Sequence, residues 1–147
     1  MPRGSPHDLR HEAARLRSCP HQGHVGASDR QPLRDEGAPA GTLRDALARD
    51  FGSYERWRAE FVATGKALRG GSGWVLLAWS PRDGKLVNQW ASDHCHTLAG
   101  GTPVLALDMY EHSYHIDFGA KADDYVETFM HAIRWDNADR LFARLNG

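Results

Sequence analysis

The chain is poor in cysteine and carries almost no net charge, and each shortage excludes a class of protein. Its 147 residues include two cysteines, Cys19 and Cys95, without a Cys-x-x-Cys spacing, which argues against a disulfide scaffold, a zinc ribbon or a thioredoxin motif. The 18 basic and 19 acidic side chains leave a formal charge of -1, so no overall field favours nucleic acid or an anionic membrane as partner. We therefore expect the function to reside in a local site.

Long apolar runs and phosphate-binding patterns are also missing. The longest apolar run, Trp74–Trp79, is too short to cross a bilayer, and the initial Met-Pro-Arg-Gly-Ser lacks the apolar stretch of a secretion signal. The glycines of the segment 70–73 precede an expected strand, whereas the glycines of a phosphate loop precede a helix. These observations predict a cytoplasmic protein without a membrane span or a nucleotide ligand.

Aromatic residues are absent from the first fifty positions, since all five Trp, four Tyr and five Phe lie at Phe51 or later. Low apolar content leaves little burial to offset the conformational entropy that a chain loses on folding. We therefore predict a divergent, poorly ordered and flexible N-terminal segment over residues 1–41, with a marginal helix possible near Asp8–Arg17. Residues 42–147 are predicted to form the folded domain.

Two helices are expected at the start of this domain and two at its end. Thr42 stands three residues before Asp45, which predicts a capping hydroxyl at the start of the first helix, and Ser53 predicts the start of the second. At the end of the chain, helical spacing of apolar residues predicts one helix containing Tyr125, Phe129, Ala132 and Ile133, and another containing Ala138, Leu141, Phe142 and Leu145.

Three strands are expected between these helices. Trp74–Trp79, the turn residues Ser80–Gly84 and the apolar return at Leu86–Ala91 are typical of a hairpin. Pro103–Leu107 supplies a third strand whose unbroken apolar pattern predicts burial on both faces. Helices, a small sheet and further helices in this order indicate an α+β domain.

The side chains best suited to bind a ligand or take part in a reaction follow the third strand, in Asp108-Met-Tyr-Glu-His112. If the backbone turns into a helix here, Asp108 and His112 are four residues apart and can present an oxygen and a nitrogen to one cation. A second interpretation needs no ligand, because an acid at a helix N-terminus favours the helix dipole and a histidine can be satisfied by a backbone group. The residues themselves leave both interpretations open.

Several motifs in register resemble the C-terminal domain of iron/manganese superoxide dismutases over roughly residues 42–145. They are Phe51-Gly-Ser53, Gly71-Ser-Gly-Trp74, Pro103-Val-Leu-Ala-Leu-Asp108, Asp108-Met-Tyr-Glu-His112 with Ser113-Tyr114, and Ile133-Arg-Trp135. The resemblance implies a small three-stranded antiparallel sheet flanked by helices. It also implies an antioxidant oxidoreductase that uses an iron or manganese ion to convert superoxide into dioxygen and hydrogen peroxide.

The same resemblance implies roles for single residues. Asp108 and His112 would be metal ligands, and Glu111 would reach across a homodimer interface to the ligand histidine of the partner subunit, although it can equally be a solvated side chain. His94 would hydrogen-bond the solvent on the metal. Alternatively, His94 belongs to a polar strand end, or forms a separate, softer site with His96 on a shared face.

The sequence also departs from the family pattern. The family places two further ligand histidines on an N-terminal helical hairpin that is not recognisable here, and His24 lies at about the right distance before Phe51 to replace one of them. Tyr110 and Leu76 stand where the family commonly has Trp, and His115 replaces a common Tyr. The alternative function is therefore a truncated or degenerate, non-catalytic member that keeps the fold and the dimer face but has an incomplete metal site.

Overall fold

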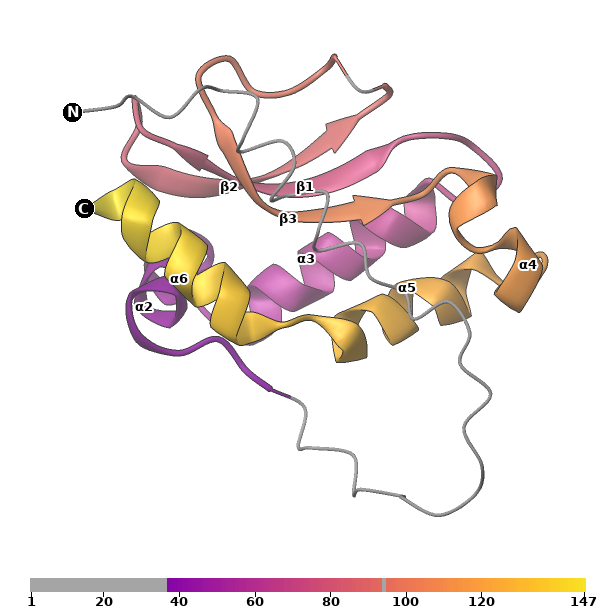
Figure 1. Ribbon diagram of the computed structural model, residues 1–147, viewed down its shortest axis with the longest axis horizontal. Helices are drawn as coiled ribbons and strands as arrows, with labels where there is room; N and C mark the ends of the chain where they lie inside the picture. The colour runs from indigo at the N-terminus through magenta and orange to yellow at the C-terminus, as the bar shows by residue number, and fades with distance from the viewer. Residues whose placement is uncertain (1–36, 94) are drawn as a thin grey trace.

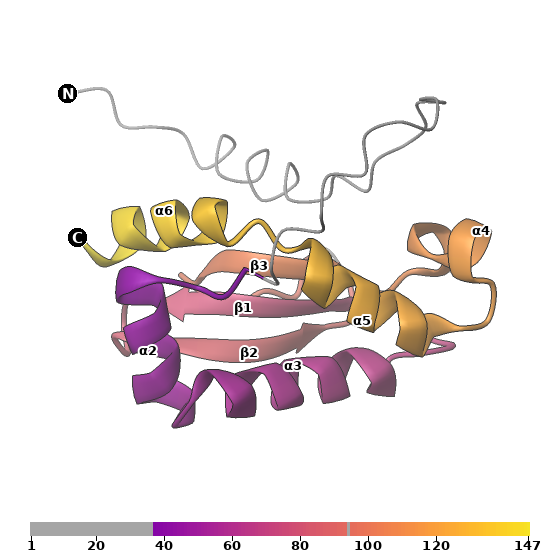
Figure 2. The same cartoon turned by 90° about the horizontal axis from the view of Figure 1, so that it is seen from below.

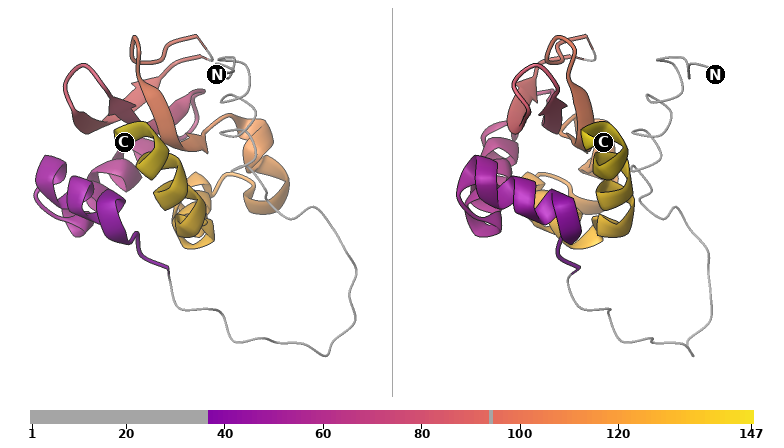
Figure 3. Two further views of the ribbon diagram at one scale, coloured as in Figure 1. Left: turned by 60° about the vertical axis from the view of Figure 1, so that its left-hand side comes forward. Right: turned by 90° about the vertical axis from the view of Figure 1, so that its left-hand side faces the viewer.

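A computed structural model describes residues 37–93 and 95–147 of the chain. In this part, a three-stranded sheet forms one layer and a group of helices forms a second layer beneath it (Figures 1 and 3). The predicted α+β class with a small antiparallel sheet is confirmed. The possible helix near residues 8–17 lies outside the described residues, and the division into segments 1–41 and 42–147 stays a prediction. No helix of the described part is long and apolar enough to span a membrane.

The helices lie on either side of the sheet in the sequence but beneath one of its faces in space (Figure 1). In the view from below they flank the strands (Figure 2). Those before the sheet pack against those after it, α2 against α6 and α3 against α5. The elements are α2 (Gly41–Phe51), α3 (Tyr54–Ala67), the 3-10 turn η1 (Glu111–Ser113), α4 (His115–Phe118), α5 (Ala122–Ala132) and α6 (Trp135–Asn146).

The two predicted helix starts differ in outcome. Ser53 caps α3 as expected, because its hydroxyl accepts a hydrogen bond from the backbone N–H of Arg56 at 3.1 Å. The predicted cap at Thr42 is wrong, since α2 begins at Gly41 and Thr42 lies inside its first turn. The N–H of Ala40, the residue before the helix, instead donates to the carboxylate of Asp139 in α6, at 3.1 Å from Oδ2. Packing between two helices therefore supplies an acceptor that local sequence does not reveal.

The sheet has the order β2-β1-β3, with both neighbouring pairs antiparallel, and comprises β1 (Trp74–Ser80), β2 (Lys85–Ala91) and β3 (Thr102–Asp108). The predicted hairpin of β1 and β2 is confirmed. The predicted third strand is also confirmed and is one residue longer at each end. Pro103, which has no N–H to donate, lies on the edge strand β3 where the register shifts opposite Leu77 and Ala78. The register places Asp108 opposite Trp74, at one end of the central strand.

Both faces of the sheet are apolar. Val75 and Leu77 belong to the main core between the sheet and the helices, where Trp57 and Phe61 of α3 are fully buried. Trp74 and Leu76 alternate with them and therefore point to the opposite face, where they form a smaller cluster with Ala91, against which Ala106 and Tyr110 pack. The end of β3 is thus fixed by packing on both sides, which provides a rigid base for the residues that follow it.

Candidate metal centre

Asp108 is held at the end of β3 by its backbone. The following N–H, that of Met109, donates to the carbonyl oxygen of Gly73 at 2.9 Å. The carbonyl oxygen of Asp108 accepts a hydrogen bond of 3.0 Å from the hydroxyl of Tyr125 in α5. The side chain of Asp108 is only 8% exposed, so its carboxylate lies in a position that neighbouring elements determine.

His112 approaches Asp108 without the helix that the sequence suggested. The expectation of a helical turn from Asp108 is wrong, because Tyr110 has extended backbone angles, φ -70° and ψ 143°, and the 3-10 turn begins only at Glu111. The N–H of Tyr110 donates to Oδ1 of Asp108 at 3.0 Å and so folds the chain back. As a result, Nε2 of His112 lies 3.4 Å from Oδ2 of Asp108. The two side chains therefore converge as predicted, but an extended residue and a 3-10 turn bring them together in place of a helix.

Tyr110 also orients the imidazole. Its ring stacks on that of His112, with centroids 5.7 Å apart and an interplanar angle of 21°, and meets Trp74 edge-on at 6.2 Å. The Tyr110 hydroxyl donates to the carbonyl oxygen of Ser92 at 3.2 Å. The His112 side chain is 71% exposed, so it is open to solutes on one side while an aromatic ring limits its motion on the other.

The donor pair fits a first-row metal ion. The separation of 3.4 Å between Oδ2 and Nε2 is longer than that of a charge-assisted hydrogen bond, roughly 2.7–2.9 Å. Two donors bound at about 2.1 Å to one ion, with an angle of 90–120° between them, are separated by about 3.0–3.6 Å. Carboxylate and imidazole without thiolate favour iron or manganese over copper(I) or a zinc-thiolate centre. Asp108 and His112 are therefore placed as neighbouring ligands of one cation would be.

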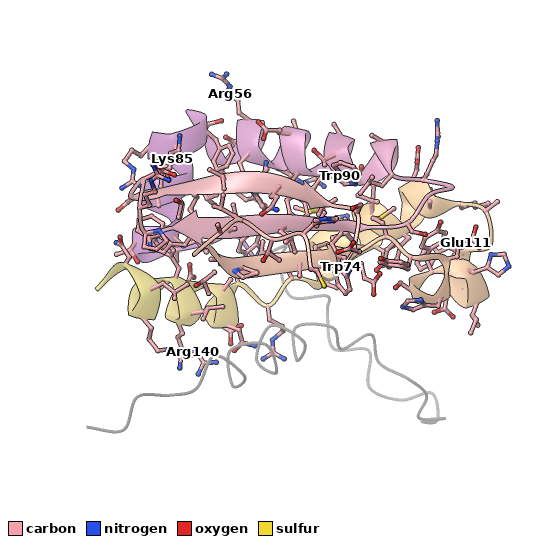
Figure 4. The ribbon with its side chains drawn as sticks, turned by 90° about the horizontal axis from the view of Figure 1, so that it is seen from above. Arg56, Trp74, Lys85, Trp90, Glu111 and Arg140 are labelled. Atoms are coloured by element: carbon pink, nitrogen blue, oxygen red, sulfur yellow. The ribbon has the colours of Figure 1, made fainter. Side chains whose placement is uncertain are left out.

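The two donors do not make a complete coordination shell. Within residues 37–93 and 95–147, no group of three or more His, Cys, Asp or Glu side chains could hold a metal ion. His24 and His94, which the sequence analysis assigned to the site, lie outside the described residues. Glu111 is exposed at the end of the molecule that carries α4, opposite Lys85, with Trp74 between them (Figure 4). Its roles as dimer contact or solvated residue both stay predictions.

The segment on either side of residue 94 is held by its own hydrogen bonds. Oδ1 of Asp93 accepts from the N–H groups of Cys95 and His96, at 2.7 and 3.1 Å. Nδ1 of His96 lies 2.7 Å from the hydroxyl of Ser92 and 3.1 Å from Oδ2 of Asp93. Gln89 of β2 accepts from the N–H of Leu98 at 2.8 Å and so joins the loop to the sheet. Nδ1 of His96 is thereby engaged with protein oxygens, and the separate softer site with His94 stays a prediction.

Sequence reasoning missed two contributors to the site, Tyr125 and Gly73. Each makes one hydrogen bond to the backbone at the end of β3. Gly73 stands in the motif Gly71-Ser-Gly-Trp74, but this motif does not reveal the contact, and Tyr125 stands in no motif. The apolar spacing that predicted α5 placed Tyr125 on the buried face, and this was the available signal that it lies near the strand end.

A small sheet that ends in a buried carboxylate and a stacked imidazole defines the chain as an α+β domain with a candidate metal centre. Residues 39–141 match the family model described as iron/manganese superoxide dismutases, C-terminal domain, and the chain belongs to this family.

Similar proteins carry the same family name. An iron superoxide dismutase of Cupriavidus metallidurans is 70% identical over 111 residues, which are 76% of this chain and 56% of that protein. Manganese superoxide dismutase 2 of Halobacterium salinarum is 42% identical over 120 residues, 80% of this chain and 58% of the relative. A manganese superoxide dismutase of Listeria monocytogenes is 39% identical over 107 residues, 72% and 52% of the two chains. The chain thus spans just over half the length of the relatives it matches.

Proposed function

We propose that this chain is a metal-dependent superoxide dismutase in which Asp108 and His112 bind an iron or manganese ion. The convergence of Asp108 Oδ2 and His112 Nε2 to 3.4 Å is the observation that carries the proposal. The family match over residues 39–141 and the names of the relatives support the same activity. The chemistry that iron or manganese supplies when bound is one-electron exchange, through which two superoxide anions and two protons become one dioxygen and one hydrogen peroxide.

The residues of the chain have distinct tasks in this proposal. Asp108 supplies a negative charge that lowers the net charge at the cation, and its burial shields this carboxylate from competing water. His112 supplies a neutral nitrogen donor, and its exposed side leaves room for a small anion to approach. Tyr110 keeps the imidazole plane fixed by stacking and directs the carboxylate by its N–H. No residue has to act as a covalent nucleophile.

Two histidines complete the proposal from outside the described residues. His24 is proposed as a further ligand from the segment 1–41, because carboxylate and imidazole alone are too few donors for firm binding. His94 is proposed to hydrogen-bond the solvent at the metal. The hydrogen bond from the Tyr110 hydroxyl to Ser92 supports this role, since it joins the loop on one side of residue 94 to the site.

The proposal also covers the oligomeric state and the cellular location. We propose a homodimer in which Glu111 reaches the ligand histidine of the partner subunit, which its exposure next to His112 supports. Glu111→Ala should shift the chain toward the monomer in sedimentation velocity at micromolar concentration, while Asp117→Ala on α4 should not. A cytoplasmic location stays a prediction from the sequence.

Metal analysis combined with a dismutation assay tests the central proposal. The full chain, refolded with Mn²⁺ or Fe²⁺, should hold about one ion and accelerate superoxide loss. His112→Gln should lose at least tenfold in metal affinity, because it removes a ligand. His131→Gln, an exposed histidine on α5, is the matched control and should retain both properties. A wild-type chain that binds no metal when refolded with it, or a His112→Gln variant that binds as tightly as wild type, would contradict the proposal and favour the non-catalytic alternative.

A further inference from the structure

We propose that Tyr125 is a positioning residue for the metal centre and keeps Asp108 and His112 in a fixed position relative to each other. This inference rests on the proposed function and assigns a task to a residue of α5 that lies outside the motif Asp108–His112. Tyr125 is 7% exposed and stands in the second turn of its helix. Its hydroxyl and its ring contact two different parts of the site.

The hydroxyl of Tyr125 acts on the strand end. It donates to the carbonyl oxygen of Asp108 at 3.0 Å, in buried surroundings where an unpaired polar group would be costly. On the other side of the same peptide, the N–H of Met109 donates to the carbonyl oxygen of Gly73 at 2.9 Å. The peptide between Asp108 and Met109 is thereby held at its oxygen by α5 and at its nitrogen by the residue before β1. Rotation of this peptide would move the Asp108 carboxylate.

The ring of Tyr125 acts on the other donor. It stacks on Tyr114, with centroids 5.3 Å apart and an interplanar angle of 29°, and meets Phe118 edge-on at 5.7 Å. Tyr114 is 4% exposed and directly follows the 3-10 turn that contains His112. The N–H of Tyr114 donates to the carbonyl of Glu111 at 3.2 Å, so a shift of Tyr114 is passed to the turn. One side chain therefore contacts both the strand that carries Asp108 and the residue that directly follows the turn with His112.

Such a link is needed because no continuous helix joins the two donors. A helix would set their separation through its own hydrogen bonds, but here the chain is extended at Tyr110 and turns only at Glu111. Metal ligands must be held to about 0.5 Å for tight binding, and residues outside the coordination shell supply that precision. Loss of a partner of this kind typically lowers metal affinity about 10- to 100-fold. Tyr110 contacts both donors from within the motif, through its ring and its N–H. Tyr125 is placed to support both of them from α5.

The test compares two variants that each remove the hydroxyl of one buried tyrosine and keep its ring. Tyr125→Phe removes the hydrogen bond to Asp108, whereas Tyr114→Phe keeps the stacked pair and leaves that bond intact. Mn²⁺ is titrated into the full chain at a temperature well below the melting point of every variant. We expect about tenfold weaker binding for Tyr125→Phe and a change of less than about twofold for Tyr114→Phe. A purely structural role would lower the melting temperature without changing Mn²⁺ affinity.

A second measurement without metal separates this inference from the proposed function. Amide hydrogen exchange should become faster at Met109 in Tyr125→Phe and stay unchanged at Leu77, in the centre of the sheet. If the wild type binds Mn²⁺ and Tyr125→Phe binds it equally well, the inference is wrong and the proposed function stands. If the wild type binds no Mn²⁺, the proposed function fails, and unchanged exchange at Met109 would then refute the positioning as well.

Discussion

The backbone N–H of Met109 donates to the carbonyl oxygen of Gly73 at 2.9 Å and so joins the exit of β3 to the entry of β1. Gly73 adopts φ +153°, and a Cβ added there would lie 2.7 Å from the carbonyl oxygen of Ala91 and 3.3 Å from Nε1 of Trp90. Because a backbone oxygen cannot move aside without breaking the sheet, the absence of a side chain at Gly73 is a condition for this arrangement.

Gly73→Ala should therefore destabilise the chain by about 3 kcal/mol, through backbone strain together with the clash. The matched control is Gly84→Ala, where φ is +62° but no atom lies within 4 Å of the added Cβ, and where about 1 kcal/mol is expected. Urea unfolding measures both free energies. Equal losses for the two variants would show that the contact with Ala91 is unimportant.

Tyr110 should influence metal affinity through its ring and less through its hydroxyl. Tyr110→Leu removes the stacking on His112, and we expect Mn²⁺ binding to weaken by about three- to tenfold because the imidazole gains freedom. Tyr110→Phe keeps the stack and removes the hydroxyl that donates to Ser92, so its affinity should stay within about twofold of wild type. The same Mn²⁺ titration measures both variants. If Tyr110→Phe lost as much Mn²⁺ affinity as Tyr110→Leu, the contact of the hydroxyl with the loop around Ser92 would be the cause, and the stacking would not.

Glu127 of α5 forms ion pairs with α3, and these should make the free energy of unfolding depend on pH. Hydrogen bonds from Lys66, at 2.7 Å, and Arg58, at 3.0 Å, hold the pKa of Glu127 below its ordinary value of 4.5, against partial desolvation. A carboxyl whose pKa is lowered on folding contributes stability above its unfolded pKa and loses it as the pH falls through the folded pKa.

Glu127→Gln should accordingly lower the free energy of unfolding at pH 7 by about 0.5 kcal/mol, a small value because the pair is partly exposed. The difference from wild type should shrink as the pH falls below 4.5. Thermal unfolding at several pH values gives the result, and added salt at pH 7 should reduce the difference as well. A constant difference from pH 7 to pH 3 would assign the effect of the substitution to packing.

His24 should contribute to metal binding if it completes the coordination shell. We expect His24→Gln to weaken Mn²⁺ binding about tenfold or more, because a two-donor site holds an ion poorly. His11→Gln is the matched control from the same segment and should bind like wild type. If His11→Gln loses more Mn²⁺ affinity than His24→Gln, His24 is not the ligand. The proposal that residues 1–41 supply a ligand would still stand.

Much of the fold could be predicted from the residues because the responsible interactions are short in range. The Ser53 cap, the turn between β1 and β2 and the apolar spacing of α5 and α6 each depend on residues a few positions apart. The resemblance to the family located Asp108 and His112 in the same way, since their motif is contiguous. Where a partner came from elsewhere, as Asp139 does for Ala40, the local prediction at Thr42 failed.

Composition and neighbour chemistry thus specified an α+β domain and brought a carboxylate and an imidazole to the end of one strand. Their separation of 3.4 Å depends on the contacts of Gly73, Tyr110 and Tyr125. Gly73 precedes β1 and Tyr125 lies on α5, both far from Asp108 in the sequence. The periodicity of side chains indicates which face a residue occupies, but it does not tell which distant backbone atom the residue will contact. The folded packing of α5 and β1 against β3 therefore determined the geometry of the site.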